Sequence, residues 1–137
     1  MLRSVAVVVV GVLMMNFIDQ ILGAVLLQAV AGGPITDQAS YLAVFERPLV
    51  PAVVVATHGL AAVLSGYVMA RLAGGHEVQH AAAASGLAVL MFLAAPAAPN
   101  MMIPPMWVRI AMIAMTPPGM IAGAYVRGQA RMIREQS

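Results

Sequence analysis

Four long apolar stretches dominate the pattern of hydrophobic and polar positions along the chain. They cover residues 5–28, 50–72, 78–95 and 106–126. A transmembrane helix needs about 20 mostly apolar residues to cross a hydrocarbon core about 30 Å thick. Each stretch is close to that length, so the pattern predicts four transmembrane helices.

The segments between these stretches predict two different connections. In residues 30–49, Thr36 and Asp37 favour the start of a helix and Pro48 favours its end. Tyr41 and Phe45 then share one face of a short helix that lies on the periplasmic membrane surface. Residues 96–105 contain four prolines and are expected to be a stiff connection without a helix. The predicted fold is therefore all-α: one domain, residues 1–137, forming a four-transmembrane-helix bundle with a short periplasmic surface helix.

The composition supports lipid as the solvent. Hydrophobic residues make up 62% of the 137 residues and charged residues only 9%, whereas soluble domains average about 25% charged residues. The chain has no cysteine, which excludes disulfides and thiolate metal ligands. Its formal net charge of +2 is too small to indicate nucleic-acid binding.

The arginines predict the orientation of the helices, because short cytoplasmic loops are enriched in arginine and lysine. Five arginines fall on one side of the predicted bundle and two, Arg47 and Arg109, on the other. The five are Arg3, Arg71, Arg127, Arg131 and Arg134. We therefore expect both ends of the chain in the cytoplasm, as in a multi-pass protein of a bacterial inner membrane.

Small residues mark the faces through which helices approach each other in lipid. The expected packing glycines are Gly59, Gly66, Gly86, Gly119 and Gly123. Pro117 and Pro118 lie inside the fourth stretch and predict a kink or local unwinding near mid-membrane.

An intramembrane polar cluster is predicted between the first two spans. Asp19 is costly in lipid and needs a partner or a function. Counting about 1.5 Å of rise per residue from the middle of each span places Asp19 and His58 at nearly the same depth. Asn16 lies one turn from Asp19, and Thr57 adjoins His58. The four side chains are expected either to hold two helices together or to bind a proton or a ligand.

Residues 76–80 match the HExxH pattern of zinc peptidases, which membrane-embedded peptidases also carry. On a helix, His76 and His80 would bind zinc while Glu77 activates a water molecule. A third ligand is hard to find on the same side of the membrane, and a glycine-rich turn before a polar helix start has the same appearance. The motif is therefore interpreted as a coincidence, without a metal site or a catalytic role.

His58 also raises the question of a cofactor, because intramembrane histidines ligate haem iron or pigment magnesium. No second intramembrane histidine completes a bis-histidine site. No cofactor is expected, with a pigment, quinone or lipid shared with a partner subunit as the alternative.

The second half of the chain resembles a class of small bacterial four-span membrane proteins of unestablished function. The residues that carry the resemblance are Gly66, Tyr67, Arg71, His80, Pro105, Trp107, Pro117, Pro118 and Gly123. The resemblance implies the four-span fold and carries over no catalytic residue.

Three functions follow from these features. The leading hypothesis is a non-catalytic integral membrane protein that is an accessory or structural subunit of a larger membrane complex. The alternative is a small transporter or channel with a polar relay through Asp19 and His58. A zinc hydrolase based on residues 76–80 is the third.

Overall fold

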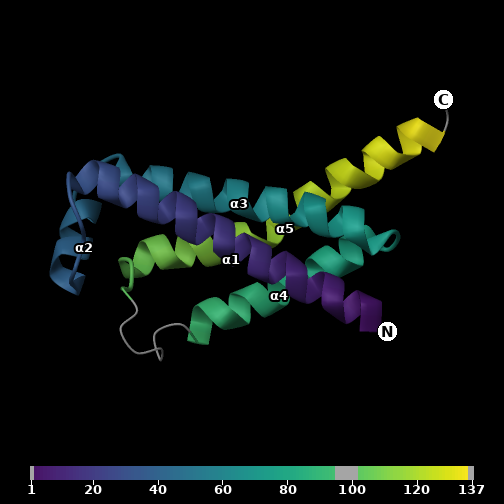
Figure 1. Ribbon diagram of the computed structural model, residues 1–137, viewed down its shortest axis with the longest axis horizontal. Coiled ribbons are helices and arrows are strands. Elements are labelled where there is room, and N and C mark those ends of the chain that lie inside the picture. The colour runs from purple at the N-terminus through teal and green to yellow at the C-terminus, as the bar shows by residue number, and fades with distance from the viewer. Residues whose placement is uncertain (1, 95–101, 136–137) are drawn as a thin grey trace.

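Five helices account for most of the residues that the computed structural model describes, which are 2–94 and 102–135 (Figure 1). They are α1 (Leu2–Ala31), α2 (Gln38–Phe45), α3 (Val50–Ala73), α4 (Glu77–Ala94) and α5 (Met106–Glu135). The predicted all-helical fold is confirmed, and so is the short helix between the first two long ones. Most of the proline-rich connection, residues 95–101, lies outside the described residues.

Three of the helices, α1, α3 and α4, are long and apolar enough to cross a membrane. The fourth expected span lies within α5, which is 30 residues long but is not among these three. Arg109, Thr116 and the two prolines that follow it lower the hydropathy of this helix. The structure therefore supports a helical membrane protein with three candidate spans.

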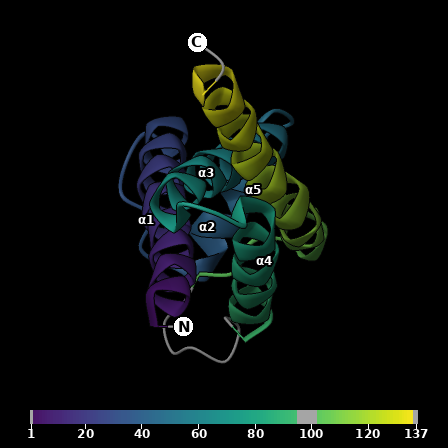
Figure 2. The same cartoon turned by 90° about the vertical axis from the view of Figure 1, so that its right-hand side faces the viewer.

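The four long helices form one bundle, and α2 covers one end of it (Figure 1). Helix α1 begins and α5 ends at the opposite end of the bundle, which faces the viewer in Figure 2. The arginines at this end include Arg3, whose guanidinium donates to the carbonyl oxygen of Leu72 over 3.3 Å.

Helix α2 is held at its start by a reciprocal capping arrangement. The Asp37 carboxylate accepts a hydrogen bond from the backbone N–H of Ser40 over 2.8 Å, and the Ser40 hydroxyl accepts from the backbone N–H of Asp37. Hydrogen bonds to its carboxylate from Ser40, first from the backbone N–H and then from the side chain, lower the pKa of Asp37. The next residue, Gln38, exchanges two hydrogen bonds with the backbone of Ile103, over 2.7 and 2.9 Å. Helix α2 is thereby fastened to the segment that leads into α5.

Two apolar cores lie one behind the other along the bundle. The core nearest the chain ends contains Val7, Val12, Met15, Ala62, Met69, Ala70, Ala81, Ala84, Ala88, Met120 and Ala124. The core nearest α2 contains Leu27, Val44, Phe45, Val50, Val54, Val108 and Met112. On α1, α3 and α5, the residues between the two sets are those around Asp19, His58 and Thr116. A polar layer therefore separates the two cores.

Glycines bring α3 and α5 into backbone contact. A Cβ added at Gly66 would overlap the backbone of Met120, and one added at Gly123 would overlap the backbone of Val63. Gly119 is nearly as close, because its Cβ would lie 2.8 Å from the Cβ of Ala62. Gly59 is less restricted, since its Cβ would lie 3.2 Å from the end of the flexible Met115 side chain.

One expectation for the helices requires correction, and another is narrowed. Gly86 is exposed on the outer face of α4, and a Cβ there would meet nothing within 4 Å, so it packs against no described part of this chain. Helix α5 remains helical through Pro117 and Pro118, which excludes local unwinding and leaves a kink as the remaining alternative. The C-terminal end of α5, yellow in Figure 1, projects from the bundle.

Replacing Gly123 by alanine is expected to destabilise the protein by about 1–3 kcal/mol or more, because the added methyl group forces α3 and α5 apart. Gly86→Ala is the matched control, since its methyl group enters open space and alanine favours the helix. Denaturation of both variants in detergent, followed by circular dichroism, checks this. Equal stability of the two variants would contradict the contact.

Candidate functional site

His58 is the point where the four long helices meet. It is carried by α3, is fully buried, and has its ring 5.1 Å from that of Phe92 on α4 in an edge-to-face arrangement. Its Nδ1 lies 3.1 Å from Oδ1 of Asp19 on α1. Its Nε2 lies 3.0 Å from the hydroxyl of Thr116 on α5. One imidazole therefore contacts a different long helix on each of three sides.

The hydroxyl of Thr116 is coupled to the tautomer of His58. Thr116 has one hydroxyl hydrogen and lies 3.0 Å from both the carbonyl oxygen of Met112 and Nε2. When the hydroxyl donates to Met112 O, its oxygen accepts from a protonated Nε2. When it donates to Nε2, that nitrogen carries no hydrogen.

One further proton belongs between His58 and Asp19. With Nε2 protonated, a bare Nδ1 would face a bare carboxylate at 3.1 Å, which is repulsive. The contact is attractive only when either Nδ1 or the carboxyl group holds a proton. With a hydrogen on Nε2 as well, the pair has no net charge, either as imidazolium with carboxylate or as imidazole with carboxylic acid. Without that hydrogen, the pair is a neutral imidazole beside a carboxylate. Although Oδ1 is close, it makes no well-aligned hydrogen bond with the buried Nδ1.

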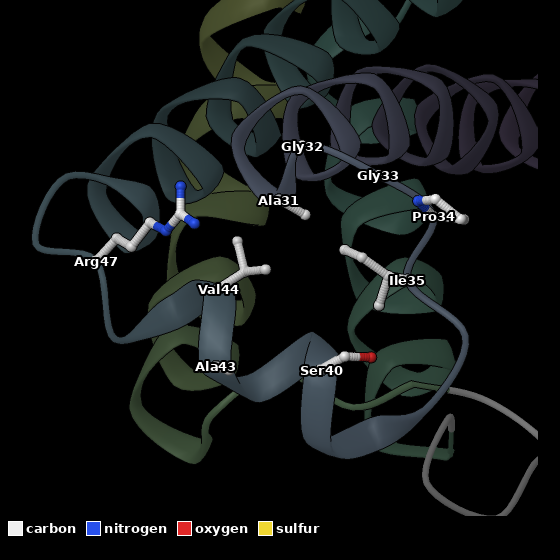
Figure 3. A pocket seen from close by; sticks show the side chains of 9 residues that line it. All are labelled: Ala31, Gly32, Gly33, Pro34, Ile35, Ser40, Ala43, Val44 and Arg47. Carbon is white, nitrogen blue, oxygen red and sulfur yellow. The ribbon is translucent and has the colours of Figure 1, made fainter.

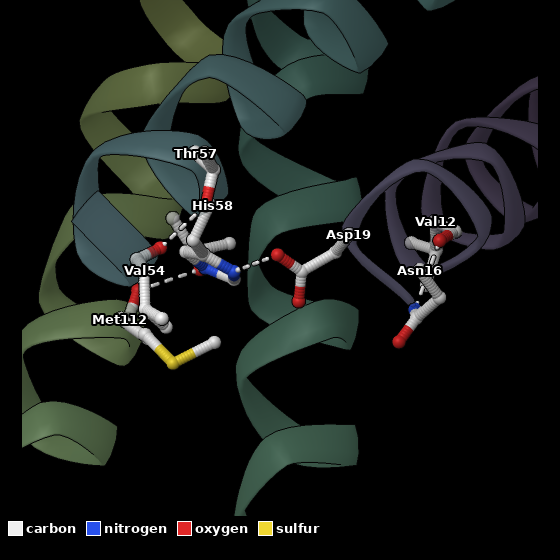
Figure 4. A network of polar contacts seen from close by, with 8 residues as sticks. Val12, Asn16, Asp19, Val54, Thr57, His58 and Met112 are labelled. Atoms are coloured by element: carbon white, nitrogen blue, oxygen red, sulfur yellow. Dashed lines mark hydrogen bonds and ion pairs between the residues drawn. The ribbon is translucent and has the colours of Figure 1, made fainter. Parts of the chain in front are cut away.

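The other two members of the predicted cluster do not join this contact (Figure 4). The side-chain amide of Asn16 donates to Val12 O over 2.9 Å, and the Thr57 hydroxyl donates to Val54 O over 2.9 Å. Each side chain thus bonds to its own helix. Both residues nevertheless line the same cavity as Asp19.

This cavity has a volume of about 750 Å³ and occupies the half of the bundle nearest α2. All five helices and the segment before α5 contribute to its wall. On α1, the exposed residues Gln20, Ala24 and Gln28 form its edge, so the cavity opens to the surroundings. Asp19 lies in the wall with 18% of its side chain exposed, whereas His58 lies behind it with none exposed. Asp19 therefore stands between the cavity and His58.

Two other ionisable groups line the cavity. Arg109 donates to the carbonyl oxygens of Phe92 and Leu93, over 2.8 and 3.4 Å, and so completes the C-terminal turn of α4. Tyr41 faces the cavity from α2. Burial raises the pKa of the Tyr41 hydroxyl to about 12, and the negative charge of Asp19 adds to the rise. Tyr41 is therefore a neutral hydrogen-bonding group at physiological pH.

A smaller cavity of about 310 Å³ lies between the end of α1 and α2 (Figure 3). Arg47 lies at its edge and donates to the carbonyl oxygen of Val30. Carbonyl groups in the last turn of a helix such as α1 have no partner within the helix itself. The remaining side chains of the cavity are mostly small or aliphatic, including Ala31, Ile35 and Val44. We interpret it as a gap in the packing beneath α2.

The HExxH residues do not form a zinc-binding face. His76 precedes α4 and has a left-handed backbone with φ of 53°, so it is not on the same helical surface as His80. The Glu77 carboxylate pairs with Arg131 at 2.6 Å instead of facing a water site. Within residues 2–94 and 102–135, no three His, Cys, Asp or Glu side chains are arranged to hold a metal ion.

His58 is equally unsuited to a pigment or haem. Both ring nitrogens face side chains of this chain, Asp19 and Thr116, so neither points toward an open coordination position. The space beside Gly59 is occupied by the Met115 side chain. In this arrangement the imidazole is a hydrogen-bonding group rather than an axial ligand.

No protein family model, curated protein or solved structure matches this chain. Its possible function must therefore be argued from its own side chains.

Thr116→Val is expected to destabilise the protein by about 1–2 kcal/mol, because valine keeps the shape but leaves the buried Nε2 of His58 without its hydrogen-bond partner. Thr57→Val is the matched control, since that hydroxyl bonds only to its own helix. Denaturation midpoints in detergent compare the two variants. If Thr57→Val lowered the denaturation midpoint more than Thr116→Val, the contact of His58 with Thr116 would add little to stability.

Proposed function

We propose that this chain is a non-catalytic integral membrane protein that exchanges protons with water and binds a small ligand at Asp19. This function places it with small proton-coupled transporters. The observation that carries the proposal is the position of the Asp19 carboxylate, which lies between a buried imidazole and an open cavity of about 750 Å³. A carboxylate that only held helices together would not need to line a cavity of ligand size.

The hydrogen-bond network offers a way to release the proton. When the pair loses a proton, the remaining one is best placed on Nδ1 of His58, where it faces the Asp19 carboxylate. Nε2 then becomes an acceptor, and the Thr116 hydroxyl rotates from Met112 O toward it. Both protonation states are then satisfied without movement of the backbone.

In this proposal α5 is a fourth membrane span, and both ends of the chain lie in the cytoplasm of a bacterium. A stripe of buried residues at every fourth position runs along α5 from Val108 to Ala124 and packs it into the bundle with the three apolar helices. Arg3, Arg71 and Arg131 belong to the helix ends opposite α2, which agrees with an enrichment of arginine on the cytoplasmic side. The expected location is the inner membrane.

The test is infrared difference spectroscopy of the purified protein as the pH is raised. Bands of the His58 ring and of the Asp19 carboxyl group should change together, as one titration, because the two groups share one proton. Asp19→Asn should abolish the coupled change. Asp37→Asn should preserve it, because Asp37 is an exposed helix cap that does not line the cavity and asparagine is also a good cap.

A folded protein whose His58 and Asp19 bands stay constant over the whole pH range would contradict proton exchange at this site. The pair would then be a structural link between helices only.

A second function, that of an accessory subunit in a larger membrane complex, is favoured by the outer face of α4. Ala82, Ala83 and Gly86 are exposed there, and small residues on a lipid-facing helix permit close approach of another helix. This function does not need the cavity.

Gly86→Leu distinguishes the two functions, because it enlarges the outer face of α4 at a position where an added Cβ meets no described atom within 4 Å. An accessory subunit should lose its partner proteins when the variant is extracted gently at native expression. A transporter should keep the coupled titration of His58 and Asp19. Leu90→Ala is the control. Leu90 is also exposed on α4, so this variant changes the surface of the helix without changing Gly86.

A further inference from the structure

We propose that the Asp19 cavity binds a hydrophobic monovalent cation and releases one proton for each cation bound. This inference rests on the proposed function, since it requires that the shared proton of Asp19 and His58 can leave to water. It adds the chemical class of the ligand and the stoichiometry of the exchange.

The wall of the cavity fits an apolar ligand with one charge. Most of the lining side chains are apolar, among them Leu27, Val54, Met91, Phe92 and Met112. A volume of about 750 Å³ is within the range of about 300–1,000 Å³ typical of small-molecule sites. The rings of Phe92 and Tyr41 also line the cavity, and aromatic faces attract cations.

The charges nearest Asp19 favour a cation over an anion. Asp19 is the acidic side chain in the cavity wall, and His58 faces it from α3. Tyr41 of α2 contributes a neutral phenol, and Arg109 of α5 already donates to two carbonyl oxygens at the end of α4. Among the described lining residues of α4, none is titratable. Arg109 keeps its positive charge, but it is bonded to the last turn of α4 and lies about two helical turns from Thr116 along α5. A cation is therefore favoured beside Asp19 itself, which is the part of the cavity next to His58.

The exchange follows from the charge of the pair. In the protonated site without ligand, Asp19 and His58 hold two protons in all, one on Nε2 and one between the two side chains, and have no net charge. When a cation lies beside the Asp19 carboxylate, the imidazolium is no longer needed to balance it. One proton leaves to water, His58 becomes neutral, and the positive charge of the ligand takes its place. The net charge inside the bundle is the same before and after binding.

Tetraphenylphosphonium is a suitable probe, because it is apolar, carries one fixed positive charge and cannot itself be protonated. We expect calorimetry of the full-length protein in buffers of different ionisation enthalpy to give one proton released per cation bound. Affinity should rise about tenfold per pH unit in the range where the site is protonated, as expected for exchange of one proton.

Three controls define the result. Tetraphenylborate has the same size and apolar character with the opposite charge, and it should neither bind at the site nor release a proton. Asp19→Asn should abolish the binding of tetraphenylphosphonium that is linked to proton release. Asp37→Asn should bind the cation as the unchanged protein does.

The outcomes separate this proposal from the proposed function. Absence of cation binding, with the coupled infrared titration of His58 and Asp19 intact, would overturn the cation proposal and leave proton exchange standing. Binding that is equal in the Asp19→Asn variant, or that releases no proton, would also overturn it, because such binding is simple partition into apolar surface. Loss of both the titration and the binding would end both proposals.

Discussion

The structure depends on accommodating three polar side chains in a layer between two apolar cores. A charged or hydrogen-bonding group in an apolar interior is costly unless each of its polar atoms has a partner. His58 has two ring nitrogens that point in opposite directions, so it needs partners on two sides at once. Asp19 and Thr116 supply them, and their helices must therefore lie on opposite sides of α3. The contacts of one ring thus constrain the arrangement of the whole bundle.

The packing of α3 against α5 makes this arrangement possible. Thr116 reaches His58 only because the two backbones are in contact further along, at Gly66 and Gly123. Apolar contact alone gains little in lipid, so this close approach and the polar contacts at His58 are what distinguish one helix arrangement from another. The apolar faces that remain outside, such as that of Val5, Val9 and Leu13 on α1, are suited to lipid.

Much of the fold could be predicted from the sequence because its signals are local. The long apolar helices follow from hydropathy, and the short one follows from the cap at Asp37. The contact between Asp19 and His58 could be expected as well, since both lie at the same depth on consecutive long helices. The contact of Thr116 with His58 is not predicted from the sequence, because the depths of residues are compared in the first two spans only. The position of Thr116 in the middle of the fourth stretch, just before Pro117, was the available signal.

Other features depend on which way each helix is rotated, and hydropathy does not determine rotation. Gly66 and Gly86 look alike in the sequence, yet one touches the backbone of α5 and the other faces outward. Asn16 and Thr57 lie beside the right residues but bond to their own helices, as short polar side chains readily do. The pairing of Glu77 with Arg131 needed the distant end of α5, which no local motif indicates.

The buried alanines of α4 have a mechanical consequence. Ala81, Ala84 and Ala88 lie in the same core as Val7 and Val12 of α1, so the two helices are close there, while the larger Met91 and Phe92 stand at the cavity further along. When two helices are packed closely at one end and lie apart at the other, a small tilt about the packed end changes the distance between them mainly at the open end. A tilt of α4 about its alanines would alter the width of the cavity and, at the same time, the position of Phe92 against His58. Access to the carboxylate and the surroundings of the imidazole would then vary together.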